Sequence, residues 1–142
     1  MAQKKKGKRS FADILEENSN ASVGNIDDLI KFSFKYLSFD NPKFVCSGAE
    51  VSYFLDLLER LKALSFMRMS DFLANRSSGL RSHPISWEDV SENGFGIPNE
   101  EQLAVSAYQF ALSANESGRV HGFIIDTRFY VVWLDRDHRL YA

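Results

Sequence analysis

The chain has 142 residues, of which 44% are hydrophobic and 25% charged, a composition typical of one globular domain that buries its own core. Its single cysteine, Cys46, excludes an internal disulfide framework and fits a reducing compartment. No long apolar run follows the N-terminus, so the sequence predicts neither a secretory signal nor a membrane span. We therefore expect a cytoplasmic protein without a membrane partner.

Charge is unevenly distributed along the chain. The first ten residues carry +5, and the rest carries −7, because the whole chain carries −2. A broad nucleic-acid-binding face normally needs a basic patch, which the acidic remainder does not predict. The candidate nucleic-acid contacts therefore lie in the basic N-terminal stretch, and they are Lys4, Lys5, Lys6, Lys8 and Arg9. The alternative is a solvated leader that only keeps the protein in solution.

Residues 1–24 form the predicted leader, and residues 25–142 form the predicted single domain. Within the leader, Phe11, Ile14 and Leu15 lie at i, i+3 and i+4 behind Ser10, a candidate N-cap. This spacing predicts a short amphipathic helix that docks on the domain or on a partner. Residues 19–25 are rich in Ser, Asn and Gly, as is typical of a linker.

The first half of the domain predicts one strand and two helices. Residues 32–36 alternate between aromatic and polar side chains, which favours a strand over a helix. Ser47 and Glu50 have the spacing of a capping box, and the long helix after them is expected to pack an apolar stripe on the sheet. Ser70 and Asp71 indicate the cap of a second, short helix that ends near residue 75. The expected stripe consists of Val51, Phe54, Leu55, Leu58 and Leu61.

The second half of the domain predicts strands. Residues 80–87 predict a strand that Pro84 confines to a sheet edge, and residues 89–98 predict a long surface loop. Residues 108–113, 119–125 and 129–134 predict a three-stranded antiparallel meander, because turn residues separate them. The expected fold class is α+β: a single domain whose antiparallel sheet of four or five strands packs against one long helix and one or two short ones.

Side chains with acid–base or phosphate-binding chemistry gather at the end of this meander. Arg119 and His121 are two residues apart on one strand, so their side chains share a face. His138, Arg139 and Tyr141 follow the end of the next strand, which is expected to pair with the first. Such a set would cleave RNA without a metal. One histidine takes the 2′-hydroxyl proton, an arginine stabilises the phosphate, and a second histidine or Tyr141 protonates the leaving oxygen.

The alternative is a purely structural role for these residues. Arg119 would then pair with Asp135 or Asp137, and His121 would be a half-buried strand residue. His83, which lies near Arg81 on a candidate strand, is a further candidate for the cluster. The spacing of the three histidines matches no recurrent ligand pattern, so the sequence predicts no metal site and no cofactor.

A strand GRVHGFIID, a tight turn, a hydrophobic strand RFYVVWLD and the ending DHRLY together resemble small bacterial toxins of the RelE/ParE type. The resemblance covers residues 108–141. It implies an antiparallel sheet packed against helices, cleavage of free or ribosome-bound mRNA, and a cognate antitoxin that wraps the toxin. It also implies that Arg119 contacts phosphate, that His121 or His138 is the acid or base, and that Tyr141 orients the substrate. The chain differs from this family in its length, its acidic domain and the strand before its long helix.

The sequence therefore leads to two functional hypotheses. The first is a metal-independent endoribonuclease of the toxin–antitoxin or phage-defence type, with Arg119, His121, His138 and Tyr141 as catalytic residues and Arg139 as an RNA contact. Its partners would be RNA, free or ribosome-bound, and a cognate antitoxin. The second is a non-enzymatic protein-interaction module of a bacterial or phage system whose basic tail touches nucleic acid.

Overall fold

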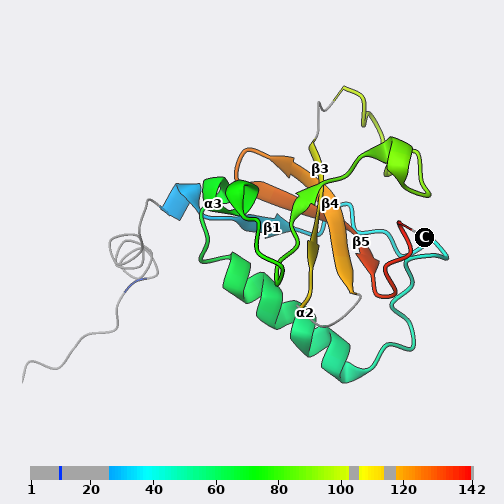
Figure 1. Ribbon diagram of the computed structural model, residues 1–142, viewed down its shortest axis with the longest axis horizontal. Helices are drawn as coiled ribbons and strands as arrows, with labels where there is room; N and C mark the ends of the chain where they lie inside the picture. The colour runs from blue at the N-terminus through cyan, green and yellow to red at the C-terminus, as the bar shows by residue number, and fades with distance from the viewer. Residues whose placement is uncertain (1–9, 11–25, 103–105, 114–117, 142) are drawn as a thin grey trace, which may run out of the picture.

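The computed structural model describes residue 10 and residues 26–102, 106–113 and 118–141. Within these residues five strands form one mixed sheet in the order β1-β5-β4-β3-β2 (Figure 1). β3 (Ser106–Ala111), β4 (Arg119–Ile125) and β5 (Arg128–Asp135) are antiparallel neighbours, which confirms the predicted meander. The predicted leader, with its amphipathic helix, lies outside the described residues except for Ser10.

The two edge strands are short. β2 (His83–Pro84) pairs antiparallel with β3, so Pro84 lies at an edge, as predicted. β1 (Lys31–Ser33) pairs with β5 in parallel, which departs from the expected antiparallel sheet. Two short 3₁₀ helices, η1 (Ile26–Asp28) and η2 (Trp87–Asp89), precede β1 and follow β2. The α+β class and the single domain are otherwise as expected.

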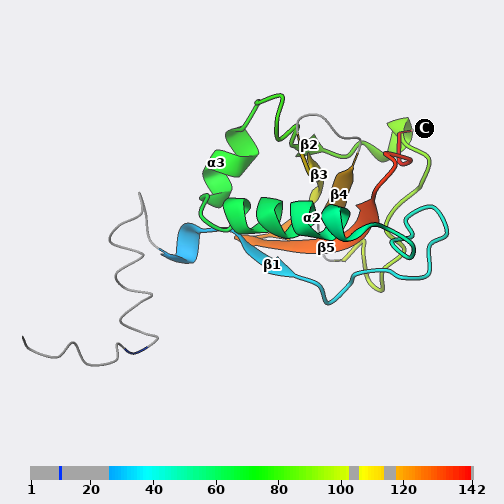
Figure 2. The same cartoon turned by 90° about the horizontal axis from the view of Figure 1, so that it is seen from below.

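Two helices lie between β1 and β2 in the chain, and the longer one crosses one face of the sheet (Figure 2). They are α2 (Val51–Leu64) and α3 (Met69–Ala74). The predicted capping box at Ser47 is wrong: Glu50 is the N-cap of α2 and makes no side-chain capping bond. The chain is still in a turn at Ser47 and Gly48, where Gly48 has a φ of 81°, so the helix begins later than the motif implies.

The cap expected at Ser70 and Asp71 is also wrong. Arg68 is the N-cap of α3, and Asp71 lies inside its first turn, where one carboxylate oxygen accepts a hydrogen bond from Arg68 Nε at 3.0 Å. The short helix itself is present, and it ends one residue before the predicted boundary. Both motifs therefore located a helix correctly while misplacing its first residue.

The face that α2 turns toward the sheet also differs from the prediction. Its buried residues are Tyr53, Leu57, Leu61 and Leu64. Of the stripe expected to be buried only Leu61 is buried, whereas Val51 and Leu58 are 74% and 60% exposed. The helix is thus rotated relative to the sequence-based expectation. Arg60 is half-buried as a result, and its Nε donates to the Leu112 carbonyl at 2.8 Å.

Hydrophobic residues cover both faces of the sheet. On the α2 side, Phe110, Val120 and Phe129 pack with Phe72 of α3 and with the buried stripe of α2. On the opposite side, Phe123 and Trp133 pack with side chains from the loops and the C-terminal segment, namely Phe44, Phe95 and Leu140. None of the described helices is long and apolar enough to cross a membrane. The predicted functional residues lie on this second, loop-covered side.

Candidate functional site

Polar side chains occupy one end of the sheet face opposite α2. In the register of the strands, His83 lies opposite Gln109, Gln109 opposite His121, and His121 opposite Trp133. Two residues before His121 on β4, Arg119 lies opposite Asp135. Cross-strand partners point to the same side of a sheet. The structure therefore brings Arg119 and His121 together with the end of β5, as the sequence predicted.

A glycine and a bulge set the position of His121. The register between β4 and β5 shifts between His121 and Gly122, so β5 has one extra residue there. A Cβ atom at Gly122 would lie 2.0 Å from the Tyr130 carbonyl oxygen, which only glycine avoids. The glycine after a histidine inside a strand was the sequence signal for this close approach.

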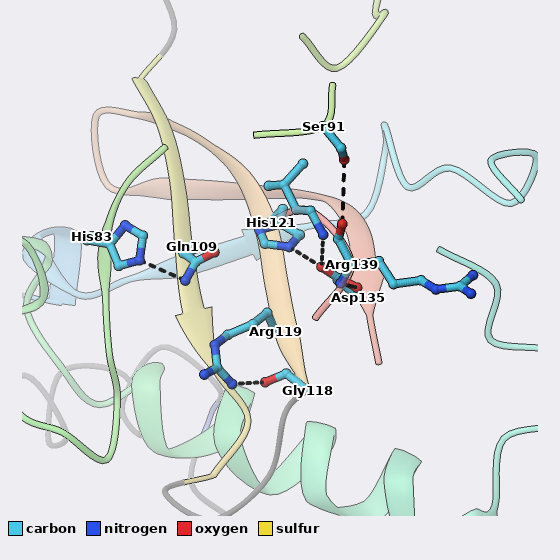
Figure 3. Close-up of polar contacts among 9 residues, drawn as sticks. His83, Ser91, Gln109, Gly118, Arg119, His121, Asp135 and Arg139 are labelled. Atoms are coloured by element: carbon cyan, nitrogen blue, oxygen red, sulfur yellow. Dashed lines mark hydrogen bonds and ion pairs between the residues drawn. The ribbon is translucent and has the colours of Figure 1, made fainter. Parts of the chain in front are cut away.

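Asp135 is the most highly bonded side chain of the face (Figure 3). Its Oδ1 accepts from the amide of Arg139 at 2.7 Å, and its Oδ2 accepts from the amide of Leu140 at 3.0 Å and from His121 Nε2 at 2.9 Å. Burial alone would raise the pKa of Asp135, but the bonds from His121 and the two amides outweigh it and hold the pKa below its usual range. The carboxylate is therefore charged and fixes the C-terminal segment to β4.

His121 is fully buried and neutral at physiological pH. Burial lowers its pKa, and the bond to Asp135 offsets this effect only in part. Because a carboxylate only accepts, Nε2 carries the proton and Nδ1 holds a lone pair. The rings of Phe44 and Trp133 lie 6.1 and 6.4 Å from the imidazole. The His121 side chain is 0% exposed, so Asp135 and the surrounding rings separate it from solvent.

Arg119 is 5% exposed, and its Nη1 donates to the Gly118 carbonyl at 3.0 Å. Figure 3 shows its side chain pointing away from Asp135. The alternative expectation was that Arg119 pairs with Asp135 or Asp137. The ion pairs observed for these carboxylates are with other residues: Asp135 bonds His121, and Asp137 lies 3.9 Å from Arg136. The Arg119 charge still acts on the site, because it lowers the pKa of His138.

His138 and Tyr141 lie together at the rim of this polar face. The centres of their rings are 5.8 Å apart. Tyr141 makes a second ring contact with His83, also at 5.8 Å. Burial lowers the pKa of His138, and the positive charges of Arg119 and Arg81 lower it further. The negative charge of Asp135 acts in the opposite direction and raises it. Burial raises the pKa of Tyr141, with a further contribution from Asp89. At neutral pH the rim therefore presents an unprotonated imidazole beside a protonated phenol.

Two rim residues have a left-handed backbone. Arg81 has a φ of 50° and His138 a φ of 55°; the other described non-glycine residues with positive φ are Asn99 and Asp126. Histidine, asparagine and aspartate adopt this conformation more readily than arginine does. Arg81 is therefore the less usual case, and two local hydrogen bonds hold it: its amide donates to the Ser77 carbonyl at 3.0 Å and its Nε donates to the Ser78 carbonyl at 2.9 Å. The charge of Arg81 contributes to the lowered pKa of His138, which relates Arg81 to the rim.

Two further members of the face are His83, which the sequence offered as an additional candidate, and Gln109, which it did not indicate. The Pro84 carbonyl lies 2.8 Å from His83 Nδ1 and only accepts, so Nδ1 carries the proton. His83 Nε2 then accepts from Gln109 Nε2 at 2.8 Å. Both ring nitrogens are thus engaged, and the His83 ring also contacts the ring of Tyr141. The sequence predicted this edge strand but not its pairing with β3, which places His83 opposite Gln109.

The remaining predicted contacts are more loosely placed. The Arg139 side chain is exposed, while its backbone is held by Asp135 and by Ser91, whose Oγ donates to the Arg139 carbonyl at 3.5 Å. The basic residues of the leader lie outside the described residues. A surface cavity of about 680 Å³ in the predicted loop region is lined by none of the predicted catalytic residues; its walls are Trp87, Asn93, Ile97, Asn99, Glu100, Glu101 and Gln102.

In the part of the chain that the structure describes, no three His, Cys, Asp or Glu residues are grouped as a metal site. Comparison with known proteins finds no matching family model, no matching curated protein and no matching solved structure.

Proposed function

We propose that the rim formed by Arg81, His138 and Tyr141 is the active site of a metal-independent endoribonuclease of the toxin–antitoxin or phage-defence type. The observation that carries the proposal is the state of His138: it is only half-buried, its pKa is lowered, and within the described residues its imidazole makes no hydrogen bond. An unprotonated imidazole with access to solvent is suited to general base catalysis.

The chemistry is a transesterification within the RNA. His138 takes the proton of a 2′-hydroxyl, and the oxygen attacks the adjacent phosphorus. A 2′,3′-cyclic phosphate forms as the bond between phosphorus and the 5′ oxygen breaks. The leaving 5′ oxygen takes a proton from Tyr141, and Tyr141 regains a proton from solvent. Arg81, which is exposed, and Arg139 contact the phosphate, and the buried charge of Arg119 supports them.

In this proposal Asp135 and His121 are positioning residues. Asp135 accepts from the amides of Arg139 and Leu140 and so fixes the short segment that presents His138 and Tyr141, while His121 donates to Asp135 and holds its carboxylate in place. A catalytic base must lie within hydrogen-bond reach of the proton it abstracts, and a segment without this anchor would lose that placement.

The test is RNA cleavage by the purified full chain, with and without ribosomes and in the presence of EDTA. His138→Ala should lower the cleavage rate by about 10²- to 10⁴-fold, as is typical when a general base is removed. Asp137→Ala, at the exposed neighbouring position, should leave the rate unchanged. In the wild type the acid side of the pH–rate profile should fall at a pH below about 6.5, because the rate is lost as His138 becomes protonated through its lowered pKa.

A wild-type protein that is inert toward free and ribosome-bound RNA, and harmless on expression, would contradict this function. The residues of the rim would then serve recognition, and the non-enzymatic interaction module would become the better proposal. Equal activity of His138→Ala and the wild type would move the catalytic site elsewhere.

A further inference from the structure

α2 carries a second apolar stripe that the rest of the described chain leaves in solvent. Val51, Leu55 and Leu58 are 74%, 56% and 60% exposed, and Phe54 beside them is 38% exposed. Their spacing of three and four residues places them along one side of the helix. Single exposed apolar residues need no explanation, but a contiguous stripe indicates a contact surface.

The size of this stripe favours an occupant from the same chain. At 1.5 Å per residue α2 is about 21 Å long and a helix is about 10 Å wide, so one side of it offers roughly 200 Å². A specific complex of separate proteins buries about 800 Å² on each partner. A tethered segment needs less area, because tethering raises its effective concentration to the millimolar range.

The residues that precede residue 26 join the described domain next to α2, so they can supply this segment. The Ile30 amide donates to the Met67 carbonyl at 3.0 Å, and Leu29 bridges to Arg68, so the described chain starts beside the C-terminal end of α2. Figure 2 shows η1 beyond that end of the helix. The stretch from residue 17 to residue 26 can extend about 30 Å, which exceeds the length of α2.

We propose that residues 11–17 dock along the exposed stripe of α2 as a short amphipathic helix. Phe11, Ile14 and Leu15 have the i, i+3, i+4 spacing that matches a helical stripe. The chain enters beside the C-terminal end of α2, so the segment runs parallel to α2, with Phe11 toward Val51. Glu16 and Glu17 then lie toward the half of α2 in which Lys62 is exposed.

This direction has a consequence for the basic leader. It carries the +5 of residues 4–9 past the N-terminal end of α2. Figures 1 and 2 both place that end on the same side of the molecule as the end of β5, which bears the candidate site. An otherwise acidic domain would thus gain its cations where RNA binds; this consequence rests on the proposed function, whereas the docking itself does not.

The first test is a disulfide in the full chain with Cys46→Ser. The pair Ile14→Cys and Leu55→Cys should form an intramolecular disulfide on mild oxidation at least about tenfold faster than the pair Ile14→Cys and Phe39→Cys. Phe39 is a matched exposed position, 81% exposed, in the loop after β1. Equal rates for the two pairs overturn the proposal, and so does a disulfide that forms only between chains, which would assign the stripe to a second copy.

The second test uses substitutions at the surface, where folding is not at risk. Leu55→Glu combined with Leu58→Glu should make chymotrypsin cleave after Phe11 several-fold faster, while Leu73→Glu on α3, 41% exposed in the parent, should not. An unchanged cleavage rate contradicts docking. The same double variant should bind single-stranded RNA more weakly than the wild type. If the wild type binds no RNA, the proposed function fails, and the disulfide still decides whether the segment docks.

Discussion

Asp135 shows how a single residue links the sheet to the candidate site. Its carboxylate accepts three hydrogen bonds, one from β4 and two from the segment after β5. Buried carboxylates are stable only with such partners, because an unpaired buried charge is very costly. The same bonds that offset this cost place His138 and Tyr141 at the rim, so the stability of this corner and the geometry of the site depend on the same atoms.

This corner should make the protein sensitive to acid. The pKa of His121 is lowered in the folded state, so the unfolded chain binds a proton first as the pH falls below about 6.5. The pKa of Asp135 is also lowered, and its contribution is lost at still lower pH. The free energy of unfolding should therefore decrease below pH 6.5, with a slope that approaches about 1.4 kcal/mol per pH unit for one proton.

Urea unfolding of the wild type and of His121→Gln at several pH values measures this effect. Glutamine keeps an N–H donor for Asp135 but does not titrate, so the variant should lose less stability between pH 6.5 and pH 5 relative to its own value at pH 7.5. Parallel pH dependences for the two proteins would show that His121 does not take part.

At the scale of elements, the sequence predicts what local periodicity determines. The meander was predicted because alternation and turn residues both mark it, and Pro84 was correctly assigned to an edge. The parallel pairing of β1 with β5 was missed because it depends on the path of the chain through α2, α3 and three further strands. The burial of His121 was missed for a similar reason: loops without periodicity supply the residues that cover it, such as Phe44.

α2 was misread because it has apolar residues on two sides. One set, Tyr53, Leu57, Leu61 and Leu64, extends to the last residue of the helix and faces the sheet. The other set, expected to be buried, stops at Leu58, and Lys62 takes the next position along that side. Periodicity detects an amphipathic helix but cannot choose between two apolar sides. The length of each apolar set indicates the buried side better than periodicity does, because the buried set extends to the end of the helix and the exposed set does not.

Two neighbouring leucines test this assignment. Leu57→Ala should lower the free energy of unfolding by about 2 to 5 kcal/mol, because it removes buried contacts and leaves a cavity. Leu58→Ala, made at a side chain that is 60% exposed, should cost less than about 1 kcal/mol. Chemical denaturation of both variants provides the comparison. A larger loss for Leu58→Ala than for Leu57→Ala would mean that the helix packs on its other side.

At the scale of the whole molecule, the separation of charge is the dominant feature. The first ten residues carry +5 and the rest −7, and from Ser82 to Gly118 the sequence contains no Lys or Arg. The described cations near the candidate site, Arg81, Arg119 and Arg139, come from outside that stretch. An RNA backbone is a dense row of negative charges, so under the proposed function the site would need cations beyond its own rim, and the leader carries five of them.

Deleting residues 2–10 should therefore affect RNA binding and not folding. Charged, solvated residues bury little apolar area, so the melting temperature should change by less than about 5 °C, which corresponds to roughly 1 kcal/mol. For single strands, counterion release gives a plot of log affinity against log salt concentration a slope of about 0.7 in magnitude per phosphate contact. The deletion removes five cations, so it should flatten this slope by up to about 3.5. Titrations of single-stranded RNA at several salt concentrations measure both slopes. Equal slopes for the full and shortened chains, with the fold intact, would show that RNA is held by the rim alone and that the leader serves only to keep an acidic protein in solution.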